Sequence, residues 1–187
     1  MIGGLASPET QLMTGEELAQ LPDADWFELI GGRLALMTPT GDEQGGVEVS
    51  IGARLLAYAE QQRSGRVRTG EVGIYVRRNP DTIRAADVLF ISNERYARKQ
   101  SASFLDVAPE LVVEVLSPTE SWSEVTQKMK EYFAIGVRVI WIVDLAARTV
   151  YAYRSLSDVR EFTAHDELTE EAVLPGFAVQ VAALFEN

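Results

Sequence analysis

One carboxylate lies in the middle of the apolar run at residues 111–116, whose sequence is LVVEVL. The acid is Glu114, and Pro118 follows shortly after the run. An apolar segment of this length is typical of a buried strand, and proline cannot continue a central strand ladder. Because burying an unpaired carboxylate is costly, Glu114 predicts a partner: a metal, a cation or a dense set of hydrogen-bond donors.

A second acid and a lysine complete a pattern around Glu114. Asp87 enters another apolar run, and Lys128 lies in a probable helix after Glu114. Adjacent strands can place Asp87 and Glu114 on one metal, with the backbone carbonyl of Val115 or Leu116 as a further oxygen ligand. Since a divalent cation stabilises charge on a phosphate and acidifies the attacking water, this pattern favours metal-dependent phosphodiester cleavage, with Lys128 near the water.

Composition limits the metal and the location. At 187 residues and 47% hydrophobic content, the chain predicts one domain over residues 1–187, with residues 1–11 as a flexible end. It has no cysteine, and His165 is its single histidine, so oxygen ligands and therefore Mg²⁺ or Mn²⁺ are expected. No apolar run reaches the roughly 20 residues of a membrane helix, and the first residues lack a signal-peptide pattern, so a cytoplasmic location is expected.

The net charge of −11 counts against nucleic-acid binding, which relies on lysine and arginine neutralising phosphates. Basic residues nevertheless cluster locally, and each cluster is either one edge of a cleft or a set of scattered surface charges. The clusters are Arg63, Arg66 and Arg68; Arg77, Arg78 and Arg84; and Arg95, Arg98 and Lys99.

The order of the predicted elements favours an α/β fold with a mixed sheet flanked by helices. A capping box formed by Thr14 and Glu17 predicts a short helix to about Leu21, and a second helix is predicted over 121–135, stopped by Gly136. A stripe of apolar residues predicts a helix over 44–62 that Gly65 ends, and 93–99 is a short helix. Two strands, 26–30 and 33–37, are predicted around a glycine turn, and the other predicted strands are 72–76, 83–91, 111–116, 137–143 and 149–153. In the tail at 161–187, only a turn at 174–177 is predicted, and the sequence does not decide between strand and helix for the rest.

Several motifs together resemble the Uma-type restriction endonuclease family of the PD-(D/E)XK nuclease superfamily. The resemblance covers about residues 12–185. It rests on ELIGG at 28–32, MTPTG at 37–41, DV at 87–88, VEVLSP at 113–118, Glu124, Lys128, Tyr132, GV at 136–137 and WIVD at 141–144.

The resemblance implies a restriction-endonuclease-like fold and an Mg²⁺-dependent endonuclease acting on DNA, commonly as a homodimer. Asp87 and Glu114 match the two metal-binding acids, and Lys128 matches a lysine moved from the strand to the helix, since Leu116 occupies the usual lysine position. Glu28 matches an acid near the start of the family pattern that contacts the metal or its water.

Two departures from the family pattern matter. Ala86 stands where a proline commonly precedes the first acid, and Gln44 stands where the family commonly has a histidine. Glutamine can form hydrogen bonds but cannot transfer protons near neutral pH, so a weakened active site is one outcome. The sequence leaves open which of Glu28, Gln44 and Glu71 surrounds a metal.

Structural roles compete with these functional ones. Asp87 can cap a strand or pair with Arg84, and Lys128 can form a surface pair with Glu124 four residues earlier. Tyr132, Trp141 and Gly136 are assigned to packing and turns. The competing functions are a non-catalytic interaction or regulatory module, which the acidic charge and Gln44 favour, and a metal hydrolase of small phosphate esters.

Overall fold

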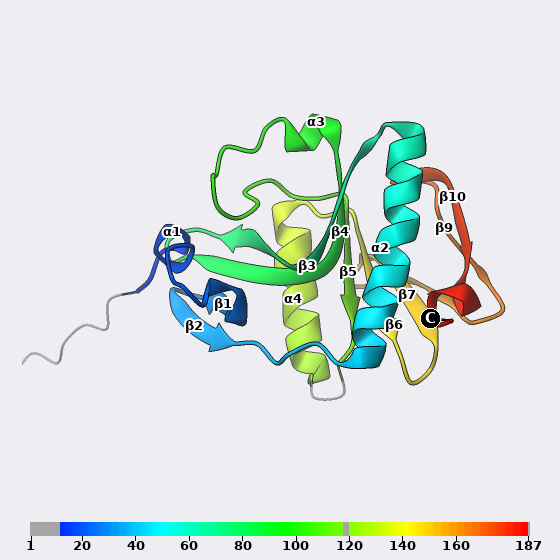
Figure 1. Ribbon diagram of the computed structural model, residues 1–187, viewed down its shortest axis with the longest axis horizontal. Helices are drawn as coiled ribbons and strands as arrows, with labels where there is room; N and C mark the ends of the chain where they lie inside the picture. Colours follow the sequence, from blue (N-terminus) through cyan, green and yellow to red (C-terminus); the bar gives the residue numbers. More distant parts are fainter. Residues whose placement is uncertain (1–11, 118–119, 187) are drawn as a thin grey trace, which may run out of the picture.

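The computed structural model describes residues 12–117 and 120–186, so the predicted flexible end at 1–11 lies outside the described residues. A mixed sheet lies between two long helices, α2 (Asp42–Gln62) and α4 (Trp122–Ile135) (Figure 1). This arrangement confirms the predicted α/β class with a mixed sheet flanked by helices. None of the described helices combines the length and apolar character needed to cross a membrane.

The sheet has the strand order β2-β1-β4-β5-β6-β7-β8, and β3 pairs with β4 outside this order. Its strands are β1 (Phe27–Ile30), β2 (Arg33–Leu36), β3 (Gly65–Arg77), β4 (Thr82–Ser92), β5 (Leu111–Val115), β6 (Val139–Asp144), β7 (Thr149–Ser155) and β8 (Asp158–Phe162). A second sheet pairs β9 (Glu167–Glu170) with β10 (Leu174–Gln180). The shorter helical elements are α1 (Gly15–Leu18), α3 (Asn93–Tyr96) and the 3₁₀ segments Ala24–Trp26 and Val181–Leu184.

Strand β4 holds the two parts of the large sheet together. It pairs with β3 along one edge, and its other edge pairs with β1 at Ile83 and with β5 at residues 88–90. Strands β5 and β6 run parallel, and α4 connects them. Asp87 and Glu114 therefore lie on neighbouring strands, as the sequence predicts.

The residues of β5 alternate between two hydrophobic cores, because successive side chains of a strand point to opposite faces. Leu111, Val113 and Val115 belong to the core beneath α2, whereas Val112 belongs to the core beneath α4. Glu114 shares the parity of Val112 and contacts side chains of α4. The continuous apolar pattern of β5 thus reflects burial of both faces of the strand, and Glu114 lies on the face toward α4.

Capping residues begin and end the helices that flank the site. Ser121 and Glu124 form a capping box at the start of α4, which was not predicted from the sequence, and Gly136 ends that helix with φ 99°, as predicted. Helix α2 ends at Gln62, as the predicted range of 44–62 requires, but Gly65 is not the residue that ends it. Arg63 caps α2 in the left-handed region with φ 49°, and Gly65 begins β3, where an added Cβ would lie 2.4 Å from the carbonyl oxygen of Ile91.

The structure also corrects one predicted strand boundary and one predicted turn. Strand β3 begins at Gly65 rather than at Val72, because its first half pairs with β4 although the alternation of its side chains is weak. The predicted turn at 174–177 lies inside β10, where Leu174 and Phe177 pack into the core beneath α2. Tertiary packing here prevails over the local turn preference of proline and glycine.

Candidate active site

A cavity of about 440 Å³ opens between the α4 side of the sheet, the β2–α2 connection and the segment after β5. Six carboxylates and two cationic side chains line it: Glu28, Glu71, Asp87, Glu114, Glu120, Glu124, Arg84 and Lys128. An excess of carboxylates repels a bare phosphate and suits hard cations, which prefer oxygen ligands. The sequence-predicted site residues Asp87, Glu114, Lys128, Glu28 and Val115 all line this cavity.

Asp87 and Glu114 lie next to each other across the pairing of β4 and β5. Val88 pairs with Val113, and these two acids are the next residues along the antiparallel strands. Asp87 is 7% exposed, and its Oδ2 accepts a hydrogen bond of 2.6 Å from the backbone nitrogen of Val115. Burial, together with the charge of Glu114, raises the pKa of Asp87 well above its ordinary value.

Two donors from α4 hold the carboxylate of Glu114. Tyr132 donates its hydroxyl hydrogen to Oε1 at 2.8 Å, and Lys128 donates from Nζ to Oε2 at 3.1 Å. Burial raises the pKa of Glu114, although Lys128 and Tyr132 oppose this shift. Glu114 therefore has the cationic partner that the sequence predicts, and Tyr132, which was assigned to packing, is also one of its donors.

Lys128 is a half-buried cation rather than half of an exposed helix pair. Its side chain is 17% exposed and also lies within 3.4 Å of Glu120 and 3.8 Å of Glu28. Burial alone would lower the pKa of Lys128, but the surrounding carboxylates, led by Glu114, raise it above its ordinary value. The ammonium group is thus positively charged at neutral pH. Glu124, the surface partner considered above, instead accepts hydrogen bonds from Ser121.

Glu28 is held by a separate ion-pair network. Its Oε1 accepts a hydrogen bond of 2.9 Å from the backbone nitrogen of Ala85, and its Oε2 accepts one of 2.7 Å from Arg84. Arg84 also donates to Glu131 of α4 at 2.6 Å. Arg84 thus joins Glu28 to α4, in place of the pairing with Asp87 that we considered. Glu28 itself lies at the edge of the site, beside Lys128.

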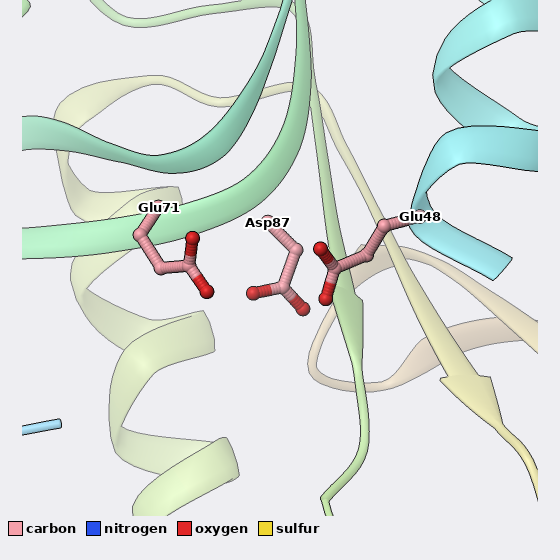
Figure 2. A group of neighbouring side chains, drawn as sticks. All are labelled: Glu48, Glu71 and Asp87. Carbon is pink, nitrogen blue, oxygen red and sulfur yellow. The ribbon is translucent and has the colours of Figure 1, made fainter. Parts of the chain in front are cut away.

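Asp87 also belongs to a second group of three carboxylates, with Glu48 and Glu71 (Figure 2). Glu48 comes from α2, Glu71 from β3 and Asp87 from β4, and one oxygen of each lies within 4.8 Å of the others. Burial, the charge of Glu71 and that of Glu114 raise the pKa of Glu48 to about 7, although Gln44 hydrogen-bonds to it. The donor set is entirely oxygen and fits a hard divalent cation.

An irregularity in β3 directs Glu71 into this group. The pairing with β4 shifts between Thr69 and Val72, and the two residues between them, Gly70 and Glu71, have φ of 84° and 50°. Such bulges redirect a side chain out of the regular alternation. Thr40 then donates a hydrogen bond of 2.6 Å to Oε1 of Glu71, which fixes the carboxylate beside the cavity.

Comparison with known proteins gives the family. Uma2, described as "Putative restriction endonuclease", matches residues 16–182. The chain belongs to the Uma2 family. Among solved structures, a protein described as a "putative nuclease belonging to DUF820 from Anabaena variabilis ATCC 29413" is similar at 18% identity, with a TM-score of 0.76, over 92% of this chain and 97% of that chain. At this identity the likeness shows a shared fold. No curated protein matches the chain.

Within this Uma2 chain, sequence reasoning missed Glu48. The signal was present, because an acid at position 48 adjoins the apolar stripe of Val47, Ile51 and Leu55 and lies on the sheet-facing side of α2. Glu71 was one of three candidates left open, and the structure brings it and Gln44 to the cavity. The metal-ligand roles of Asp87, Glu114 and Val115 remain predictions.

Proposed function

We propose that this Uma2 protein is an Mg²⁺- or Mn²⁺-dependent endonuclease that hydrolyses DNA phosphodiester bonds. The single observation that supports it most is the placement of Lys128 on the carboxylate of Glu114, next to Asp87, in one acidic cavity. In this proposal Asp87, Glu114 and the backbone carbonyl of Val115 hold the metal. A bound divalent cation supplies stabilisation of phosphate charge and a more acidic water.

Each residue of the site has a distinct task in the proposal. Because Lys128 stays protonated, it orients the attacking water by donating a hydrogen bond and does not act as the general base. Tyr132 keeps Glu114 in place through its hydroxyl. Glu28, itself fixed by Arg84, restrains Lys128 through a second, longer contact of 3.8 Å.

Binding of DNA to a chain of net charge −11 requires local positive surface. Arg66 and Arg68 of β3 lie over the ring of Tyr96, with guanidinium carbons 4.3 and 5.9 Å from the ring centroid. We propose this surface for phosphate contacts and a homodimer for cleavage of both strands, acting in the cytoplasm.

Supercoiled plasmid provides the test. Incubation with the purified protein and Mg²⁺ or Mn²⁺ is expected to give nicked and linear DNA, and Glu114→Ala is expected to abolish the reaction. Glu60→Ala, an exposed change on α2, serves as the control and keeps activity. Absence of cleavage by the wild-type protein, or equal cleavage by Glu114→Ala, overturns the proposal.

A second candidate is a non-catalytic interaction module that keeps the nuclease fold. The acidic cavity and Gln44, in place of the histidine that the family pattern favours, support it. Binding of Mn²⁺ without plasmid cleavage, at all metal concentrations tested, is the result that would favour this module over the enzyme.

A further inference from the structure

We propose that Glu48, Glu71 and Asp87 bind a divalent cation on the α2 side of Asp87. Glu48 is a ligand of this cation and is not among the metal ligands proposed for cleavage, which include Asp87 and Glu114. The inference goes beyond the proposed function, with which it shares only Asp87. It predicts metal binding whether or not the protein cleaves DNA.

The spacing of the three carboxylates suits one ion. One oxygen from each lies within 4.8 Å of the others. Ligand oxygens bind Ca²⁺ at about 2.3–2.6 Å and Mg²⁺ at about 2.0–2.1 Å, so two oxygens on opposite sides of one ion are about 4–5 Å apart. Figure 2 shows the three carboxylates directed toward a common region from three different elements. A cation can therefore contact all three with small side-chain adjustments.

Glu48 supplies an independent sign of a missing ligand. The residue is 7% exposed, and its Oε1 is a buried atom without a hydrogen-bond partner among the described residues. A buried carboxylate oxygen without a donor is costly, and such groups are usually paired or bound to a metal. The unpartnered atom belongs to the same carboxylate that faces Glu71 and Asp87.

The charge of the group is also unbalanced. Within the described part of the chain, none of the ion pairs involves Glu48, Glu71 or Asp87. Lys128, a half-buried cation that lines the same cavity as Asp87 and Glu71, pairs with Glu114, Glu120 and Glu28. A divalent cation on the α2 side would neutralise this group without disturbing the contacts of Glu114 to Lys128 and Tyr132.

The backbone brings Glu48 and Glu71 together at this place. The bulge in β3 turns Glu71 toward the group, and Gly52 lets α2 approach the same part of β3 closely. A Cβ at Gly52 would lie 2.7 Å from Cγ2 of Thr69, immediately before the bulge. Gly52 lies about one helical turn after Glu48, so the close approach carries Glu48 toward the sheet.

Calorimetric titration of the metal-free protein with Mn²⁺ tests the site directly. We expect Glu48→Gln to weaken Mn²⁺ binding by about tenfold or more, because it removes a ligand charge with little change of shape. Glu60→Gln on the exposed face of α2 is the matched control and should bind Mn²⁺ like the wild type. Circular dichroism verifies that each variant is folded.

Anomalous scattering from crystals soaked in Mn²⁺ gives a second measurement. A peak among Glu48, Glu71 and Asp87 supports the site, and it does so even if the plasmid assay shows no cleavage. Unchanged Mn²⁺ affinity in Glu48→Gln, or a peak that contacts Asp87 and Glu114 but neither Glu48 nor Glu71, overturns the inference. Plasmid cleavage together with unchanged affinity would refute this site and leave the nuclease proposal intact.

Discussion

The hydroxyl of Tyr132 donates a hydrogen bond of 2.8 Å to the carboxylate of Glu114, and both residues are buried. Tyr132→Phe removes this donor and leaves a buried carboxylate oxygen without it. We expect the free energy of unfolding to fall by about 1–3 kcal/mol. Chemical denaturation measures the change, and Tyr96→Phe, whose ring rather than hydroxyl contacts Arg66, should remain within about 0.5 kcal/mol of wild type. Equal stability of the two variants would contradict the prediction.

Lys128→Met tests the role of the half-buried cation at Glu114. The variant keeps the long apolar stem but removes the charge beside Glu114. We expect plasmid cleavage to fall by about a hundredfold or more, within the range of a group that assists proton transfer. Lys128→Arg, which keeps a cation, should retain more activity than Lys128→Met. Equal rates for Lys128→Met and wild type would remove Lys128 from the proposed reaction.

Arg84 links Glu28 to Glu131 in a largely buried network, with Arg84 and Glu28 side chains 9% and 8% exposed. Arg84→Met removes the closest cation of the buried Glu28 and leaves only the longer contact of 3.8 Å to Lys128, so we expect a loss of about 3 kcal/mol in the free energy of unfolding. The matched change Arg98→Met breaks an exposed pair with Glu94 and should cost less than about 1 kcal/mol. Urea denaturation compares the two, and similar losses would mean that the buried network is unimportant for stability.

The capping box at the start of α4 predicts a dependence on pH. Hydrogen bonds from Ser121 lower the pKa of Glu124 below its ordinary value of 4.5. Because the folded-state pKa is the lower one, this interaction stabilises the protein above about pH 4.5, and the stabilisation is lost as the pH falls through the lowered value.

Ser121→Ala should therefore lower the melting temperature by about 2–4 °C at pH 7. The difference from wild type should narrow as the pH falls below 4.5, the ordinary value for Glu124. Thermal denaturation between about pH 3 and pH 7 measures both effects. A difference that stays constant over this range would show that the carboxylate of Glu124 does not contribute through the cap.

The sequence was sufficient to predict the elements that carry Asp87, Glu114 and Lys128. Glu114 interrupts a strongly apolar run, and its cost of burial predicted a partner: a metal, a cation or a set of donors. In the structure Lys128, on the helix that follows, is one such cation. Gly136 marked the end of that helix, and the predicted range of 121–135 matches the observed Trp122–Ile135. These predictions depend on residues close together in the sequence, so tertiary packing does not change them.

Glu48 and Glu71 could not be placed in the same way. The bulge that turns Glu71 depends on pairing with β4, and the alternating pattern that predicts strands fails where two residues leave the ladder. Glu48 is one polar residue beside an apolar helix stripe, and only the packing of α2 on the sheet decides whether it is buried. Strand β10 was missed for a related reason. Pro175 and Gly176 indicate a turn in the sequence, whereas the burial of Phe177, which holds this segment in the strand, depends on tertiary packing.

The position of β4 has a consequence for hydrogen exchange. Its backbone is bonded to β3 on one edge and to β1 and β5 on the other, whereas α4 meets the sheet through side chains. Local openings start where fewer backbone bonds cross between elements, so the amides of β4 should exchange last. If α4 separates from the sheet first, Lys128 moves away with it, while Asp87 and Glu71 stay together on the paired strands β4 and β3. The acidic residues would then remain close together after the lysine has left the site.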